Sequence, residues 1–299
     1  MDFQSIALPT ELRYLYNFKQ YCLLIAGANI EPFLYFPKQI LKKMNLYICT
    51  SKNITMLLTI DVGNTRIKVA VFEHNKQLDF FIFETTEALK NFKNIFKKYS
   101  HLQKITLSSV GKLDEEVLDY IKSQFPTEII SHHSRFPFKN LYSTPETLGI
   151  DRMVLAAGAT LQFPSQNRLI IDAGTCITYD YVNSNNEYLG GAISPGISIR
   201  YKSLNDYTSK LPLLSISEDF KIIGDSTKNA IHSGIINGVI FEIEGFISQY
   251  SLKNQDLTII LTGGDAEFLA KRLKNTIFAN SNFLPESLNL LSLYTHQND

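Results

Sequence analysis

Two acidic residues each end an apolar stretch and are followed by small residues that form a turn. Asp61 lies in residues 57–71 (LLTIDVGNTRIKVAV), and Asp172 lies in residues 170–182 (IIDAGTCITYDYV). In both segments β-branched residues resume after the turn, which predicts a strand, a turn and a returning strand. Because glycine has no Cβ, the backbone of such a turn can approach a ligand closely. Neighbouring N–H groups and a hydroxyl can then hold phosphate oxygens.

A third apolar strand, in residues 259–265 (IILTGGD), runs into a glycine pair. One Asp-x-Gly turn is weak evidence of function, because such turns end strands for geometric reasons in many proteins. Two of them in order, with the glycine pair behind a third strand, favour a functional site. A carboxylate cannot bind phosphate directly, but it can hold the Mg²⁺ that neutralises phosphate charge. The pattern therefore predicts a nucleoside triphosphate site between two facing turns.

The first turn supplies the candidate phosphate-binding residues. Asp61 is the candidate carboxylate on the Mg²⁺ side of the nucleotide. For Lys68 a surface salt bridge is an equally good interpretation, since this lysine lies on the returning strand. The predicted ATP-binding residues of this segment are Asp61, Val62, Gly63, Asn64, Thr65, Arg66, Ile67 and Lys68.

From Met56 onward, strands alternate with amphipathic helices, which is typical of α/β layering. We expect strands at 56–61, 66–73, 78–84, 105–109, 128–131, 168–173, 176–182, 187–193 and 257–262. We expect helices at 86–99, 114–124, 153–161, 226–250 and 265–274, and one more after Pro285. Both halves begin with a strand, an Asp-x-Gly turn and a strand, which suggests a duplicated domain with the nucleotide between the copies.

Composition excludes several classes of partner. The chain has 29 basic and 29 acidic residues and a formal net charge of +0, which gives no electrostatic case for nucleic acid or an anionic membrane. Three widely spaced cysteines, Cys22, Cys49 and Cys176, indicate no disulfide framework and fit the reducing cytoplasm. No uninterrupted apolar run reaches the roughly 18 residues needed to cross a bilayer, and the N-terminus lacks the basic region of a signal peptide. A small-molecule partner is the better expectation.

Residues 1–55 differ from the rest, because they are rich in aromatic residues and show no clear period. Two hypotheses remain open. In the first, the start is over-extended, and Met56 is the true start directly before the first strand. Alternatively, these residues form a genuine extension, with short helices near 10–20 and 37–44, that packs on the catalytic body or on a partner.

The three strand-and-turn motifs resemble the phosphate-1, phosphate-2 and adenosine motifs of the superfamily of sugar kinases, acetate kinases and actin-like ATPases. Residues 148–152 (LGIDR), 172–175 (DAGT) and 190–196 (GGAISPG) narrow the resemblance to type III pantothenate kinases, over nearly everything from Met56 onward. The resemblance implies an α/β fold of two ribonuclease-H-like domains, 56–167 and 168–299, that flank an interdomain nucleotide cleft. It also implies ATP-dependent phosphorylation of pantothenate to 4′-phosphopantothenate, the first step of coenzyme A biosynthesis, with Mg²⁺ and a monovalent cation, K⁺ or NH₄⁺.

The resemblance also assigns roles to single residues. Asp151 would be the general base, Asp172 the K⁺ ligand and Thr175 an ATP contact. Arg152 would help to bind the carboxylate of the substrate, because a guanidinium matches a carboxylate bidentately. The implied substrate-binding residues are Tyr142, Gly149, Ile150, Asp151, Arg152 and Thr227, with Thr227 contributed by the neighbouring subunit of a homodimer.

Each of these residues also has a purely structural interpretation. Asp151 could be an N-cap or first-turn acid favoured by the helix dipole, and Arg152 could form an ordinary surface ion pair. Tyr142 could be a buried core residue, and Thr227 could be an N-cap. The apolar stripe of the 226–250 helix must face either a core or a partner subunit, and we take it as support for a homodimer. Its members are Ile231, Ile235, Val239, Ile243, Phe246 and Tyr250.

Two other functions are compatible with the motifs. One is a phosphatase of the same superfamily, in which water replaces the alcohol. The other is a regulatory relative that keeps the fold without turnover, although such relatives usually show decayed motifs. This sequence departs from the family pattern at Cys176, where an alanine usually follows Asp-Ala-Gly-Thr, which places an oxidisable thiol near the expected ATP site.

Overall fold

A computed structural model describes residues 56–63, 66–108, 113–254, 256–275 and 277–298. The described residues belong to one compact unit that spans residues 52–299. Both hypotheses about residues 1–55, including the two short helices, lie outside the described part of the chain. So do Asn64 and Thr65 of the predicted phosphate loop.

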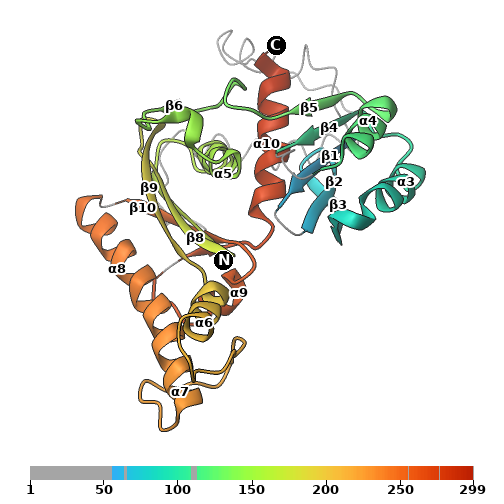
Figure 1. The fold of residues 1–299 in the computed structure, drawn as a ribbon. Coiled ribbons are helices and arrows are strands. Elements are labelled where there is room, and N and C mark those ends of the chain that lie inside the picture. Colours follow the sequence, from blue (N-terminus) through green and yellow to red (C-terminus); the bar gives the residue numbers. More distant parts are fainter. Residues whose placement is uncertain (1–55, 64–65, 109–112, 255, 276, 299) are drawn as a thin grey trace, which may run out of the picture. The chain divides into compact units, whose positions relative to one another are not determined.

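The first sheet has the strand order β3-β2-β1-β4-β5 (Figure 1). Its strands are β1 (Met56–Val62), β2 (Arg66–Glu73), β3 (Lys76–Glu84), β4 (Lys104–Leu107) and β5 (Thr127–Ile129). The hairpin strands β1, β2 and β3 are antiparallel, whereas β4 and β5 run parallel to β1. Helices α3 (Ala88–Lys98) and α4 (Glu115–Gln124), with a 3₁₀ turn at Thr85–Glu87, contribute Phe92, Ile95, Phe96, Val117 and Ile121 to the core against this sheet.

The second sheet repeats this plan with the order β11-β10-β7-β8-β9-β6. Its strands are β6 (Lys139–Asn140), β7 (Asn167–Ala173), β8 (Cys176–Val182), β9 (Glu187–Pro195), β10 (Leu257–Thr262) and β11 (Phe278–Ala279). The strands β7, β8 and β9 are antiparallel, and β10 runs parallel to β7. Both halves therefore begin with the hairpin that the sequence predicted.

Two layers of helices cover the second sheet. On one side lie α6 (Ile197–Asp206), α7 (Thr227–His232), α8 (Gly238–Lys253) and α9 (Ala266–Ala270); on the other lie α5 (Ile150–Gln162), preceded by a 3₁₀ turn at Pro145–Thr147, and α10 (Phe283–Asn298). Alternate strand residues separate the two cores: Ile171 and Ile177 belong to the first, and Ile170 and Val182 to the second.

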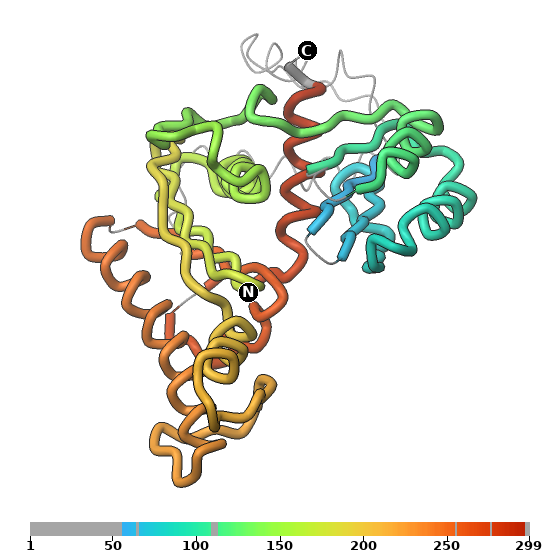
Figure 2. The backbone as a smooth tube through the Cα atoms, viewed as in Figure 1, coloured from blue at the N-terminus to red at the C-terminus, as the bar shows by residue number. Residues whose placement is uncertain are grey.

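Helix α10 packs against both sheets. Phe283, Leu288 and Leu291 are buried with the residues of α5 and β7, and α10 also contacts β1, β2 and β4. The Thr106 hydroxyl on β4 donates to the Ser292 hydroxyl on α10 at 2.8 Å, with both side chains buried. The chain thus runs from the second sheet back to the first through this helix (Figure 2).

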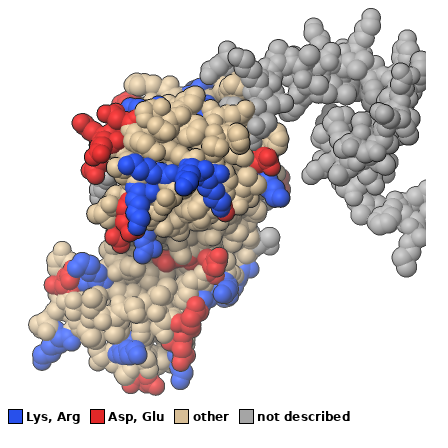
Figure 3. All heavy atoms as spheres, turned by 90° about the vertical axis from the view of Figure 1, so that its right-hand side faces the viewer, with Lys and Arg blue, Asp and Glu red and all other residues tan. Residues whose placement is uncertain are grey.

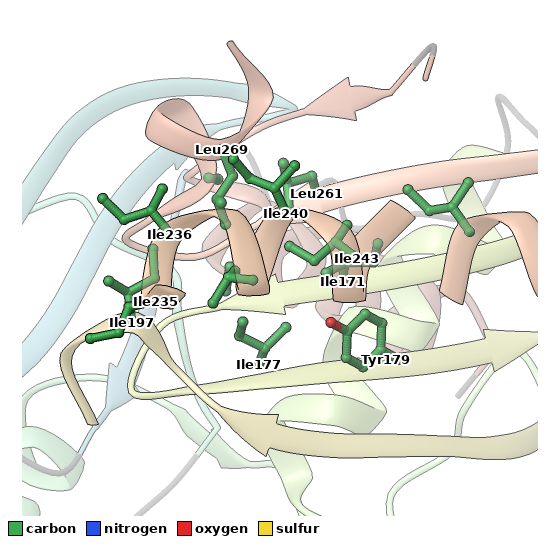
Figure 4. Close-up of a cluster of buried hydrophobic side chains, with 14 of the residues drawn as sticks. Ile171, Ile177, Tyr179, Ile197, Ile235, Ile236, Ile240, Ile243, Leu261 and Leu269 are labelled. Carbon is green, nitrogen blue, oxygen red and sulfur yellow. The ribbon is translucent and has the colours of Figure 1, made fainter. Parts of the chain in front are cut away.

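The predicted 226–250 helix is built in three parts, because a π-helical turn at Ser233–Asn237 joins α7 to α8. Its apolar stripe faces the second sheet: Ile235 and Ile243 lie among Ile171, Ile177 and Tyr179 (Figure 4). The stripe is therefore core, and our use of it as support for a homodimer was wrong. By length and composition, Thr227–Lys253 is the one helical stretch among the described residues that could cross a membrane; its packing identifies it as a core helix.

Several elements differ from the sequence prediction. Helix α6 was not predicted, and the two-residue strands β6 and β11 were missed. The helix expected at 265–274 spans only Ala266–Ala270, and the last helix begins at Phe283, so that Pro285 lies in its first turn, where proline is tolerated. The division at residues 167 and 168 stays a prediction; α5 and β6, which precede it, pack with the second sheet.

Charged residues of both signs reach the surface on the side where α3 and α4 lie (Figure 3). Helix α3 contributes four exposed lysines, Lys90, Lys93, Lys97 and Lys98. One of them, Lys98, forms an ion pair with Asp79 at 2.5 Å. The mixture of signs agrees with the zero formal net charge.

Candidate active site

Asp61 lies at the end of β1, directly opposite Lys68 in the antiparallel ladder with β2. On its other side, Ser108 follows the parallel strand β4, and its hydroxyl donates to Asp61 Oδ1 at 2.8 Å. Burial raises the pKa of Asp61, while the Ser108 hydrogen bond and the Lys68 charge oppose this shift. Two neighbours in the same sheet thus act on this carboxylate: Ser108 through a hydrogen bond and Lys68 through its charge.

Asp172 occupies the matching place at the end of β7, between Thr178 of β8 and Thr262 of β10. Burial raises the pKa of this carboxyl to about 7. Lys68 lowers it, and the charges of Asp151, Asp61 and Asp180 raise it further. Because the residues at both paired positions are uncharged threonines, Asp172 has less local compensation than Asp61.

The glycine pair of the third motif packs directly on the second turn. Gly263 has φ 97°, and a Cβ at this position would lie 2.3 Å from Ala173 O and 2.4 Å from Asp172 Oδ1. A side chain is excluded for both reasons. The Asp265 N–H donates to Ala173 O at 2.9 Å, which fixes this turn against the Asp-Ala-Gly-Thr segment.

The end of β9 returns to the same turn. The Gly196 N–H donates to Thr175 O at 3.0 Å, and the Gly174 N–H donates to Cys176 O at 2.9 Å. The side chains of Thr175 and Cys176 are both exposed. The second and third motifs and the GGAISPG segment therefore meet around one loop, with a hydroxyl and a thiol at its surface.

Asp151 lies in the first turn of α5, two residues after the N-cap Gly149. It is exposed, and its Oδ1 accepts the Arg152 N–H at 2.8 Å. The charge of Asp151 raises the pKa of both Asp61 and Asp172. The three carboxylates, which come from β1, β7 and α5, therefore lie within electrostatic range of one another, and Lys68 is the cation that acts on both strand-end carboxylates. Asp151 is a first-turn acid and not the N-cap.

Arg152 is buried and does not form the surface ion pair that we considered. Its Nη2 lies 2.6 Å from Asp180 Oδ1 and its Nε donates to the same oxygen at 2.9 Å, with the residue only 6% exposed. Burial alone would lower the pKa of Arg152, but the hydrogen bond and charge of Asp180 raise it above its ordinary value. The Tyr142 ring lies beside the guanidinium, 5.9 Å from centroid to Cζ, and Tyr142 is only partly buried.

The remaining predicted residues fall into two groups. In the first turn, Val62 and Ile67 are core residues, Arg66 is exposed, and the Gly63 N–H closes the turn by donating to Arg66 O at 3.0 Å. Their contact with phosphate stays a prediction. Ile150 and Gly149 are partly buried at the start of α5.

Thr227 is exposed at the first position of α7, which lies apart from α5 and β1 (Figures 1 and 2). The N-cap of α7 is Ser226, whose hydroxyl accepts the Asn229 N–H at 3.2 Å. The interpretation of Thr227 as the N-cap was wrong by one residue. This chain does not bring Thr227 to the other site residues.

Sequence analysis missed Ser108, Asp180 and Tyr188. Asp180 had a signal, because it is a charged residue inside an otherwise apolar strand (ITYDYV, residues 177–182) and so had to be paired or at an edge. Ser108 follows a strand of the first sheet, but only the pairing of β4 with β1 reveals that it meets Asp61.

Among the described residues, no group of three or more His, Cys, Asp or Glu side chains is arranged to hold a metal ion by itself. The strand-end carboxylates could instead share a cation with phosphate oxygens, as Mg²⁺ sites commonly do. The arrangement suits phosphoryl transfer, in which the protein mainly positions reactants and stabilises charge.

The two mixed sheets, each opened by a hairpin with an aspartate at the turn, define an α/β fold. A solved Campylobacter jejuni chain assigned to the Baf family of transcriptional activators has this fold, with a TM-score of 0.51 and 22% identity over 79% of this chain and 98% of that one.

Comparison of sequences identifies the family within this fold. Residues 57–249 match the model of the type III pantothenate kinase family. The type III pantothenate kinase of Flavobacterium johnsoniae is 55% identical over 244 residues, which are 82% of this chain and all of the relative. That of Flavobacterium psychrophilum is 54% identical over 242 residues, again over its whole length. The chain belongs to the type III pantothenate kinase family, and membership in a kinase family implies a divalent metal ion with the nucleotide.

Proposed function

We propose that this chain transfers the γ-phosphoryl group of ATP to the primary hydroxyl of pantothenate, giving 4′-phosphopantothenate and ADP, the first step of coenzyme A biosynthesis. The observation that supports the proposal is electrostatic: the charge of Asp151 raises the pKa of both Asp61 and Asp172, and Lys68 lowers both. A site with this excess of negative charge suits cation-bound phosphate groups.

Asp151 acts as the general base in this proposal. Its carboxylate is exposed at the start of a helix, where an alcohol can reach it, and it accepts the hydroxyl proton as the phosphoryl group is transferred. Tyr142, Gly149, Ile150 and Arg152 would form the pantothenate pocket around it. The Arg152 guanidinium stays protonated and supplies positive charge for the carboxylate of the substrate.

The residues present fit the expected cations. Asp61 would hold Mg²⁺ together with phosphate oxygens, and Asp172 would hold K⁺ or NH₄⁺. Burial raises the pKa of Asp172 to about 7, and among the described residues this carboxylate forms no ion pair. Mg²⁺ supplies charge neutralisation at the β- and γ-phosphates when it is bound. Lys68, Thr175 and the backbone of residues 61–67 would position the triphosphate.

The test is a coupled assay of ADP formation on the full chain and on a chain that begins at Met56, with and without pantothenate, in K⁺ against Na⁺ buffer. We expect ADP only with pantothenate and faster turnover in K⁺. ADP formation that is independent of pantothenate would favour the phosphatase, and its absence in every combination would favour the non-catalytic relative.

Asp151→Ala tests the assignment of the base. Removing a general base costs about 10²–10⁴ in rate, so kcat should fall by this factor while nucleotide binding, measured by calorimetry, persists. Near-normal kcat would remove Asp151 from this role.

We also propose a cytoplasmic homodimer in which Thr227 completes the pantothenate pocket of the partner subunit. Exposed apolar residues support an interface: Ile222 is 65% exposed, Ile223 79% and Phe241 57%. Light scattering gives the oligomeric state. Mixing inactive Asp151→Ala and Thr227→Ala proteins should then restore activity, since a mixed dimer has one intact pocket; a monomer, or a mixture without activity, would contradict the shared pocket.

A further inference from the structure

Neighbouring residues of β8 carry two similar clusters on opposite faces of the second sheet. Asp180, on the face toward α5, binds Arg152 and also accepts the Tyr188 hydroxyl at 2.5 Å. Tyr179, on the face toward α8, donates its hydroxyl to Glu242 at 2.9 Å, and Glu242 lies 2.6 Å from Arg200. Each cluster therefore contains one carboxylate, one arginine and one tyrosine.

The two clusters differ in burial. Asp180 and Tyr188 are fully buried and Arg152 is nearly so. The side chains of Arg200 and Glu242, in contrast, are 22% and 24% exposed. A buried ion pair requires nearly complete hydrogen bonding, because an uncompensated buried charge is costly. Asp180 meets this requirement with four hydrogen bonds, two from Arg152, one from Tyr188 and one from Thr178 to Oδ2 at 3.2 Å.

The buried cluster is connected to the proposed pantothenate pocket. Arg152 directly follows Asp151 and donates its backbone N–H to the Asp151 carboxylate. The Tyr142 ring contacts both the guanidinium and the Tyr188 ring, whose centroid lies 6.1 Å away in an edge-on arrangement. Asp180 and Tyr188 thus support Arg152 and Tyr142 from the side of the sheet.

We infer that Asp180 is a positioning residue for pantothenate, because it fixes the Arg152 guanidinium and, through Arg152 and Tyr188, the Tyr142 ring. It occupies the Nε and one Nη2 donor of Arg152, so the remaining donors lie on the Nη1–Nη2 edge. The carboxylate of the substrate would therefore accept hydrogen bonds from Nη1 and Nη2 of Arg152, and not from Nε. This inference rests on the proposed function, since pantothenate is the substrate that carries the carboxylate.

The experiment compares Asp180→Asn with Glu242→Gln, the matched change in the other cluster, by steady-state kinetics with pantothenate and with ATP varied in turn. Both variants keep the shape of the side chain and remove one buried or partly buried charge. For Asp180→Asn we expect the KM for pantothenate to rise about tenfold or more, as the loss of a hydrogen-bonded charge partner predicts, with a smaller change in the KM for ATP. Glu242→Gln should leave the KM for pantothenate within about twofold of the parent value.

Tyr188→Phe and Tyr179→Phe form a second, milder pair, which decides the question if Asp180→Asn fails to fold. Only Tyr188→Phe should raise the KM for pantothenate, by about threefold to tenfold. Equal effects in both clusters, or an unchanged KM in a folded Asp180→Asn or Tyr188→Phe protein, would overturn the inference alone. A parent enzyme without pantothenate-dependent ADP formation would overturn the proposed function, and the inference with it.

Discussion

The two aspartate hairpins have the same backbone plan but different electrostatic surroundings. Asp61 has a lysine directly across the ladder and a serine hydroxyl bound to its carboxylate. Asp172 has threonines on both neighbouring strands, and burial raises its pKa to about 7. A duplicated motif has thus become two inequivalent sites: Asp61 has a hydrogen bond and a facing lysine, whereas the pKa of Asp172 is raised to about 7 although Lys68 lowers it too.

The strongest test of this inequivalence compares the kcat values of Asp61→Asn and Asp172→Asn in K⁺ and in Na⁺ buffer. If Asp61 holds the divalent ion, its loss should lower kcat by about 10³, the effect of losing a major electrostatic interaction in the transition state. Asp172→Asn should lower kcat less and should abolish the difference between K⁺ and Na⁺. Equal losses, with K⁺ dependence kept in both variants, would contradict the comparison.

The second test measures how the free energy of unfolding depends on pH. Asp172 has a raised pKa in the folded protein, so its contribution to stability is complete below pH 3.8 and is lost as the pH rises toward about 7. The loss amounts to roughly 4 kcal/mol at most. In chemical unfolding at pH 8 without K⁺, Asp172→Asn should therefore be more stable than the parent.

Addition of K⁺ should reduce the difference in unfolding free energy between the parent and Asp172→Asn, because K⁺ should stabilise the parent protein alone. Two results would contradict a K⁺ site at Asp172. One is an equal free energy of unfolding for the parent and Asp172→Asn at pH 8, and the other is a K⁺ effect of equal size in both proteins.

Lys68→Met should raise the pKa of both aspartates, because Lys68 lowers the pKa of each. The acidic limb of the kcat/KM profile should move to higher pH, and the rate at pH 7 should fall about tenfold. Lys76→Met, on the neighbouring strand β3 and exposed, is the control. An equal shift of the acidic limb in both variants would assign the effect to general surface charge, and no shift in Lys68→Met would contradict the role of Lys68.

Ser108→Ala should have the smallest effect, since it removes one hydrogen bond to Asp61 and leaves Lys68 in place. We expect kcat/KM for ATP to fall about threefold to tenfold. Ser123→Ala provides the control, because Ser123 is exposed and its hydroxyl has its hydrogen bonds within α4, donating to Tyr120 O and accepting from Gln124 Nε2. No change in Ser108→Ala would mean that the hydrogen bond does not matter to the nucleotide.

The elements that the sequence predicted well depend on local patterns. A strand, a small-residue turn and a returning strand can be recognised within fifteen residues, and both hairpins were confirmed. The surface against which an apolar stripe packs was harder to predict. The stripe on the 226–250 helix was recognised, but whether it faces a core or a subunit depends on the sheet beneath it. Helix α6 was missed: it directly follows Gly196, and in this region we predicted only the strand at 187–193.

The site was only partly predictable for the same reason. Asp61 and Asp172 were predicted from their local motifs and Asp151 from the family resemblance, whereas Asp180 and Ser108 act on partners 28 and 47 residues away in the chain. Neither partnership leaves a periodic trace in the sequence. The error at Thr227 was a shift of one residue, which the adjacent Ser226 made easy, because both residues are good N-caps.

Helix α10 has a consequence for the order of events during synthesis. Gly158 allows α5 and α10 to cross closely, since a Cβ there would lie 1.9 Å from Ser287 Oγ, and α10 also contacts β1. A ribosome that has released both sheets still retains the helix that packs against each of them. Until it emerges, the apolar faces of α5 and β1 lack their cover, so the nascent protein should be most exposed to chaperones and proteases at that stage.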